Sequence, residues 1–434
     1  MNTDNSHRGL LVRSLEIIII AAAALSLLAP FLYAQDEATA VADRTLPIEN
    51  PRFALQQGTD QLINDWTFES LKLDVDQETA SGKVEVTPQG EALLRVPDDG
   101  RGVILEGTTE TARGDLVSAP FELAPFRLVD VTVEYAFESG EPLLFVCLRP
   151  TADRGMVDLD FLPKNPPGTE SRATVRLHSG LLQGEYSLAV SVVGVGSARV
   201  CSIEAREAGE YPRPHKPVFV VDLLRDNPRP DGELGWGDAE KFTKLFGFPS
   251  IEYAHYTELT PEKLAAADPA LIILSPKSRD LVRPDRGKLT TAMNAVMGYD
   301  APVVGICAGH QVLPMVIGQG AYVYRQAEDT PEGRKYLSEW GPTKLQVVKD
   351  DPLFKGFPRY PYFYASESHE ASVSGEFQGA DILASTEFCP TQIFKYPDKP
   401  WYTFQCHIER DWEFACPESY LFWKNMLRMW NLAP

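Results

Sequence analysis

The chain has 434 residues, of which 44% are hydrophobic and 24% are charged. This length predicts two or three domains, and the apolar fraction excludes a disordered protein. Lys and Arg total 41 against 61 Asp and Glu, a net charge of −20 that argues against nucleic-acid binding. The six cysteines are too few for a disulfide scaffold, and their spacing does not suggest zinc. We therefore predict no metal site and no cofactor.

The N-terminus has the layout of an export signal. Arg8 and Arg13 precede an apolar run over residues 15–34, and small residues follow it at Ala34 and over 38–40. A secretory signal peptide, residues 1–34, has this order of regions. The run is also near the length of a membrane span, so the alternative is an uncleaved anchor through residues 15–34. Either way we expect the rest of the chain outside the cytoplasm, as a periplasmic, extracellular or membrane-anchored protein.

Residues 46–208 predict an all-β domain. Short alternating or apolar runs recur between turn-forming residues, and none has the period of a long helix. This spacing favours a β-sandwich or a jelly roll. By analogy with other exported folds, the domain could bind a glycan or pack on a protein partner, and no ligand motif supports the glycan. The predicted strands fall near residues 83–87, 92–96, 102–105, 128–135, 143–148, 173–177, 186–193 and 198–203.

The pattern changes after a Pro-rich linker at residues 209–217. Short buried strands are expected at 218–223, 270–274 and 302–306, and helices at 238–246 and 288–297. Apolar strands that alternate with helices indicate an α/β domain over 218–434, with a mostly parallel sheet flanked by helices.

Cys307 is the candidate nucleophile. It lies in Gly305-Ile306-Cys307-Ala308-Gly309, between a predicted strand and a predicted helix. This spacing matches a nucleophile elbow, in which a strained strand-to-helix turn presents the reactive side chain. The helix N-terminus favours a thiolate, and the backbone N–H of Ala308 would point toward an oxyanion. The alternative is a small buried cysteine in a glycine-containing turn.

A thiolate that attacks an amide needs a general acid and a group that orients it. His407 lies at the end of an aromatic strand, with Glu409 two residues further on. In extended backbone these two side chains project to the same side, so Glu409 can fix the imidazole tautomer. His310 lies on the elbow helix and cannot readily turn back to Cys307.

These two segments together resemble the class I glutamine amidotransferase family, which carries G-x-C-x-G-x-Q and a later Q-F-H-P-E-like segment. The resemblance covers residues ~215–434 and implies an amidotransferase-like, flavodoxin-like fold with a Cys307, His407 and Glu409 triad. It also implies a small-molecule amide substrate and a substrate-binding role for Gln311. The segment containing Ser368 and His369 resembles the stretch whose backbone holds the α-amino end of the substrate.

The chain departs from the family at three points. The loop after the predicted strand at 270–274 contains Lys277 and Arg279 where the family has glycines, which suggests a more anionic substrate. Cys406 and Ile408 flank His407 in place of Phe and Pro. We expect no synthetase domain to accompany the amidotransferase-like half, so transfer of ammonia to a second site has no evident acceptor, whereas the related γ-glutamyl hydrolases release glutamate to water.

The favoured prediction is therefore an exported cysteine hydrolase that cleaves a glutamine or γ-glutamyl amide through a thioester. Two alternatives stay open at this point. The chain could be a non-catalytic binding or sensor protein on the same fold, or a carbohydrate-binding protein that acts through its β-sandwich. Cys147 could bridge Cys201, and Cys389 could pair with Cys416, but unpaired thiols fit the sequence as well.

Overall fold

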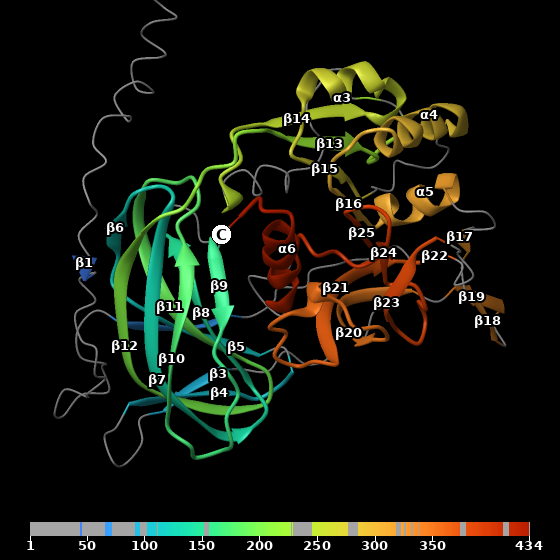
Figure 1. The fold of residues 1–434 in the computed structure, drawn as a ribbon. Helices are drawn as coiled ribbons and strands as arrows, with labels where there is room; N and C mark the ends of the chain where they lie inside the picture. Colours follow the sequence, from blue (N-terminus) through green and yellow to red (C-terminus); the bar gives the residue numbers. More distant parts are fainter. Residues whose placement is uncertain are drawn as a thin grey trace, which may run out of the picture. The chain divides into compact units, whose positions relative to one another are not determined.

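The computed structural model contains three large sheets and four α-helices among the residues that it describes (Figure 1). Among those residues, no helix combines the length and apolarity needed to cross a bilayer. The predicted signal or anchor over 1–34, and the predicted strand at 83–87, lie outside the described residues. These comprise 44–45, 66–71, 92–95, 102–110, 112–151, 156–226, 228, 245–276, 285–317, 323–324, 327–330, 333–336, 338–373, 379–410 and 416–433.

Two antiparallel sheets make up the described N-terminal part of the chain, as the alternating pattern predicts. The first has the strand order β10 (Ser171–His178), β7 (Arg127–Gly140), β12 (Gly196–Glu210), β4 (Val103–Gly107), β3 (Ala92–Arg95). The second has the order β2 (Thr67–Leu71), β5 (Arg113–Val117), β11 (Gly184–Val193), β8 (Leu143–Pro150), β9 (Asp158–Phe161), and β6 (Phe121–Leu123) also pairs with β11. The short strand β1 spans Arg44–Thr45.

Alternation along the strands separates a buried face from an outer face. In β7, Val129, Val131 and Val133 are fully buried. Thr132, which lies between two of them, and Glu134, which follows the last, are not buried. Strand β8, in the second sheet, contributes Leu144, Val146 and Leu148 to the same apolar cluster, so residues of both sheets share one core.

A nine-stranded sheet forms the C-terminal part. Its order is β14 (Ile251–His255), β13 (Val218–Asp222), β15 (Leu271–Leu274), β16 (Val303–Ile306), β25 (Trp401–Phe404), β24 (Ile393–Tyr396), β23 (Asp381–Ser385), β20 (Glu339–Val347), β21 (Tyr362–His369). Two small antiparallel pairs accompany it: β17 (Val323–Tyr324) with β22 (Ser372–Val373), and β18 (Ala327–Thr330) with β19 (Gly333–Tyr336).

The prediction of a mostly parallel sheet holds for only half of this sheet. The strands from β14 to β25 pair in parallel, whereas those from β25 to β21 pair antiparallel. The pairing changes from parallel to antiparallel between β25 and β24. Only residues 397–400 join these two strands. A connection this short can only form a hairpin, since a parallel pair needs a long crossover.

Helices cover the parallel strands on the face that does not join the large core. These are α3 (Pro261–Ala267), α4 (Arg286–Met297) and α5 (Ala308–Ile317), which share an apolar cluster with Val221, Ile272 and Val303. Helix α6 (Glu418–Met429) instead joins the cluster that contains the neighbouring strand residues Val220 and Ile273. Adjacent residues of each strand therefore face different helices, which is why these strands are apolar throughout. Two 3₁₀ turns complete the elements, at Tyr256–Glu258 and Pro352–Phe354.

The described residues from 45 onward form one compact unit. The predicted boundaries at 46–208, 209–217 and 218–434 stay predictions. The predicted helix at 238–246 lies mostly outside the described residues, whereas α4 confirms the helix predicted at 288–297.

Candidate active site

Cys307 occupies a strained turn between β16 and α5. Its φ is 49°, in the left-handed region that side chains with a Cβ rarely adopt. Its backbone N–H donates to the carbonyl of Phe404 at 2.7 Å, and its own carbonyl accepts from Gln311 N–H at 3.1 Å. The turn therefore holds Cys307 between the neighbouring strand β25 and the first turn of α5, as a nucleophile elbow requires.

The two glycines that flank Cys307 are required by close contacts. A Cβ on Gly305 would lie 2.7 Å from Thr403 Cγ2 and 2.9 Å from the carbonyl carbon of Gly309. A Cβ on Gly309 would lie 2.5 Å from the carbonyl oxygen of Leu274. Only glycine lets α5 approach strands β15 and β25 this closely, and this approach sets the position of Cys307.

His407 and Glu409 form the predicted pair. His407 Nδ1 lies 2.6 Å from Glu409 Oε1, and both side chains are buried. The backbone N–H of His407 donates to the carbonyl of Ser366 at 2.8 Å, which ties the segment after β25 to β21. Because Nδ1 is taken by Glu409, Nε2 is the ring nitrogen available to exchange a proton with Cys307.

Electrostatics keep His407 protonated at neutral pH. Burial of the ring opposes the charge, but Glu409 and the nearby Cys307 side chain outweigh it and raise the pKa of His407 to about 10. Burial would raise the pKa of Glu409, but His407 and Arg410 lower it. An imidazolium beside a thiol favours the thiolate, so the arrangement suits a cysteine nucleophile with a proton donor ready for the leaving group.

The polar side chains of α5 have structural partners. His310 is fully buried, lies 2.9 Å from Thr403 Oγ1 through Nδ1 and stacks on Phe394, and burial lowers its pKa to about 3. It is a packing residue, in agreement with its exclusion from catalysis. Gln311 donates through Nε2 to the carbonyl of Ala371 and to Gln405 Oε1, both at 3.0 Å. Its predicted contact with substrate stays a prediction.

His369 points into a buried acidic cluster. Its Nε2 lies 3.0 Å from Glu339 Oε2 and 3.1 Å from Glu367 Oε2. Burial opposes its charge, but the two carboxylates outweigh it and raise the pKa of His369 to about 10. The side chain of His369 is thus already paired with two glutamates. The substrate-binding role predicted for Ser368 and His369 would therefore fall to their backbone, as the resemblance implies.

The structure describes some of the other predicted site residues and not others. Ala308 is the first residue of α5, as an oxyanion donor after Cys307 should be. Lys277 and Arg279 lie outside the described residues. No disulfide joins any of the six cysteines, so neither of the two suggested disulfides forms. Cys406 is buried in the large apolar core.

Sequence reasoning missed the buried partners of the site, Glu339 and Glu367. The signal for Glu367 was present, because Glu367 and His369 are two residues apart in an extended segment and project to one side. Glu339 could not be found in this way, since its place opposite His369 depends on the register of β20 with β21.

The fold places Cys307 on a strand-to-helix turn of an α/β sheet, which is the arrangement of a nucleophile elbow. Residues 249–413 match the family model described as "Glutamine amidotransferase class-I". Over these residues the chain is class I glutamine amidotransferase-like.

Relatives of known name match part of the chain. A glutamine-hydrolyzing GMP synthase subunit from Methanocaldococcus jannaschii is 32% identical over 126 residues, which are 29% of this chain and 60% of that protein. The glutamine-hydrolyzing GMP synthase of a Parafrankia species is 32% identical over 202 residues, 45% of this chain and 32% of that protein. The chain therefore spans less than two thirds of the length of these relatives.

Two solved structures are also similar. One is a protein described as a putative GMP synthase subunit from Thermoplasma acidophilum, with a TM-score of 0.39, 19% identity, and coverage of 51% of this chain and 96% of that one. The other is a glutamine amidotransferase from Methylobacillus flagellatus, with a TM-score of 0.34, 19% identity, and coverage of 50% and 74%.

Proposed function

We propose that this chain hydrolyses the amide of glutamine, or a related γ-glutamyl amide, through a thioester on Cys307. One observation carries the proposal: Cys307 sits at positive φ on a strand-to-helix turn, beside a His407 that is paired with Glu409. The match to the glutamine amidotransferase family and the glutamine-hydrolyzing relatives support glutamine as the substrate.

The proposed reaction uses the charges that the site already holds. The Cys307 thiolate attacks the amide carbon, and the oxyanion accepts a hydrogen bond from the N–H of Ala308. His407 gives its proton to the leaving nitrogen, so that ammonia or an amine departs and a thioester remains. Water then attacks the thioester and gives a proton to His407, which releases the acid and restores the thiolate. Glu409 holds the ring throughout.

The test is ammonia release from glutamine by the full chain, compared with a Cys307→Ala variant. We expect the variant to lose turnover to background and the wild type to be labelled on Cys307 by an electrophilic glutamine analogue, read by mass spectrometry. Cys147→Ala is the matched control, because Cys147 is an equally buried thiol in β8.

Two results would contradict the proposal. Full turnover in Cys307→Ala would remove the nucleophile from the reaction. A wild-type chain that neither releases ammonia nor takes the label would favour the alternative of a non-catalytic binding protein on this fold.

A further inference from the structure

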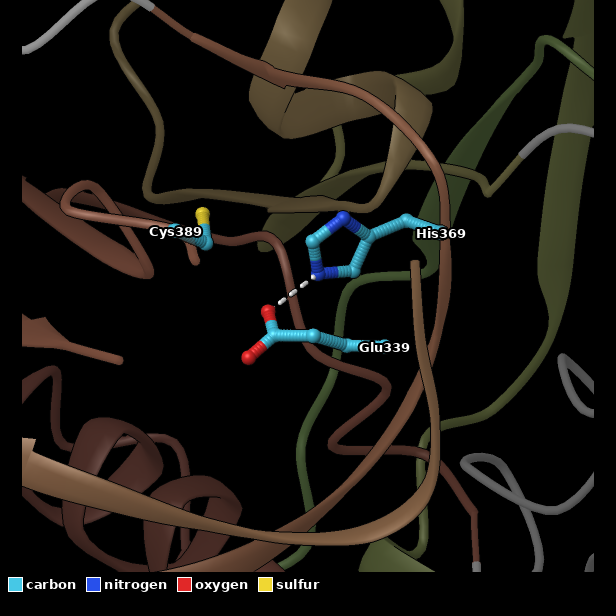
Figure 2. A group of neighbouring side chains, drawn as sticks. All are labelled: Glu339, His369 and Cys389. Carbon is cyan, nitrogen blue, oxygen red and sulfur yellow. Dashed lines mark ion pairs between the residues drawn. The ribbon is translucent and has the colours of Figure 1, made fainter. Parts of the chain in front are cut away.

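The cluster around His369 brings together donors that suit a transition-metal ion. Glu339 begins β20, Glu367 and His369 end β21, and Cys389 lies between β23 and β24. One ligand atom from each of Glu339, His369 and Cys389 lies within 4.8 Å of the others, and all three side chains are buried. Figure 2 shows the imidazole of His369 facing the carboxylate of Glu339, with Cys389 beside them.

An ion pair with His369 does not by itself explain the surroundings of Glu367. Glu367 is only 2% exposed, and among the described residues neither of its carboxylate oxygens accepts a hydrogen bond of ordinary geometry. Nε2 of His369 lacks such a bond too, although two carboxylate oxygens lie 3.0 and 3.1 Å from it. A single N–H cannot point at both oxygens, whereas a cation between the three atoms would satisfy all of them.

The surrounding hydrogen bonds are those that metal ligands normally have. His369 Nδ1 lies 3.1 Å from the carbonyl of Ala371, so Nδ1 carries the proton and Nε2 is left to bind a metal. Gln392 donates through Nε2 to Glu339 Oε2 at 2.8 Å and so orients that carboxylate. Both groups that support the ligands are thus already in place.

The donor set selects the metal. A thiolate, an imidazole and carboxylates together suit Zn²⁺, whereas Mg²⁺ and Ca²⁺ prefer oxygen donors alone. Tetrahedral zinc with bonds of about 2.0–2.1 Å to N and O separates those atoms by about 3.3 Å, close to the contacts of His369 Nε2. The ligand atoms of Glu339, His369 and Cys389 all lie within 4.8 Å of one another, so closing them to a zinc–sulfur geometry needs a contraction of at most about 1 Å.

We propose that Glu339, Glu367, His369 and Cys389 form a structural zinc site that joins β20, β21 and the loop between β23 and β24. On binding, Zn²⁺ takes the place of the protons held by the Cys389 thiol and by His369 Nε2, and these protons pass to solvent. The site lies beside the catalytic residues, because Ser366 of β21 holds the backbone of His407 and the carbonyl of Ala371 also accepts from Gln311. The metal would brace the strand against which His407 is placed.

The test measures metal binding without reference to activity. The full chain is loaded with zinc, dialysed and analysed for metal, and is also titrated with Co²⁺ as a spectroscopic probe. We expect about one zinc ion per chain and a thiolate-to-cobalt charge-transfer band. Cys389→Ala should abolish the band, and Glu339→Gln should weaken zinc affinity at least 10-fold.

Two controls separate this site from other thiols and from the proposed reaction. Cys147→Ala and Cys307→Ala should both keep the metal and the band, so failure of catalysis and failure of metal binding are distinguishable. The wild-type cobalt spectrum does not depend on whether a variant folds. A wild-type chain without a charge-transfer band, or a band that survives in folded Cys389→Ala, overturns the proposal and leaves His369 as an ion-pair partner of two glutamates.

Discussion

At the catalytic turn, the carboxylate of Glu409 determines how far into the alkaline range His407 keeps its proton. The two groups are 2.6 Å apart and buried, so their attraction is little screened by water. It outweighs the burial that would otherwise discharge the imidazole, and the pKa of His407 is raised to about 10. An enzyme that uses this imidazolium as its acid should therefore stay active at alkaline pH.

Glu409→Gln tests this at the scale of one residue. The amide keeps the shape but removes the charge, so His407 should lose its proton nearer its ordinary pKa of about 6.5. We expect kcat to fall by about 10²-fold or more, and the alkaline limb of the kcat/KM profile to move to lower pH. The measurement is the pH profile of ammonia release. Glu387→Gln, the same change at an exposed position, should leave the profile in place.

The residues of the site differ in how well sequence could locate them. Cys307, His407 and Glu409 carry their signals in short motifs, and the structure brings the predicted His407 and Glu409 into contact beside Cys307. The cluster of Glu339 and His369 has no such motif, because its members come from different strands. Their contact depends on strand register, which a single sequence leaves open.

At the scale of an element, α5 depends on how closely it can approach the sheet. Gly309 packs against the backbone of Leu274, and Gly305 lies under Thr403 and Gly309. These contacts are with backbone or a stiff β-branched side chain, which yield less readily than the end of a flexible side chain. A methyl group at either glycine should therefore displace the whole helix together with Cys307.

Gly309→Ala should lower the free energy of unfolding by about 1–3 kcal/mol, because its Cβ would clash with the carbonyl oxygen of Leu274 at 2.5 Å and with the Leu274 Cβ at 2.6 Å. Turnover should fall as well, since the start of α5 moves with the turn. Gly287→Ala in α4 is the control, where the nearest atom is 3.4 Å away, and it should be neutral or stabilising by up to about 1 kcal/mol. Denaturant unfolding of both variants measures the difference. Equal stability of the two would show that α5 adjusts without strain.

The sheet shows which elements a sequence can and cannot define. The buried strands β13, β15 and β16 were predictable because each is a short apolar run that alternates with helical patterns. The antiparallel half was not, because amphipathic strands such as β20 and β21 show neither their partners nor their direction. The hairpin of β24 and β25 was not among the predicted elements either.

At the scale of the whole molecule, α6 joins the core of the antiparallel sheets through buried polar contacts. Lys424 Nζ lies 3.2 Å from Asp158 Oδ1 and 2.9 Å from the carbonyl of Leu159, and Tyr420 donates to the carbonyl of Val157 at 3.0 Å. Lys424 and Asp158 are at most 3% exposed. Residues 157–159 and α6 are more than 250 positions apart in the chain, so this contact joins two segments that are distant in the sequence.

The charge on Asp158 gives this contact a pH dependence of known sign. Burial opposes the charge, but His178, Lys424 and Arg428 outweigh it and lower the pKa of Asp158. Burial also lowers the pKa of His178, which leaves Lys424 and Arg428 as the cationic groups near Asp158 at neutral pH. Because the folded-state pKa of Asp158 lies below its unfolded value of about 3.9, the pairing adds stability above that pH. This contribution is lost as the pH falls through the folded-state pKa.

Lys424→Met should therefore destabilise the chain most strongly at neutral pH. It leaves Asp158 charged, buried and without its lysine, which costs about 3–5 kcal/mol of unfolding free energy. As the pH falls toward 4, Asp158 becomes protonated in the folded variant, which removes its unpaired buried charge and narrows the gap to the wild type. The wild type loses its own pairing only below the unfolded-state pKa of about 3.9, where the two stabilities should converge further. Lys349→Met is the matched control, because its pair with Asp381 is half exposed at a distance of 2.7 Å and should contribute about 0–1 kcal/mol. Denaturant unfolding across this pH range gives the comparison, and a gap between Lys424→Met and wild type that stays constant with pH would mean that Asp158 is not the group left unpaired.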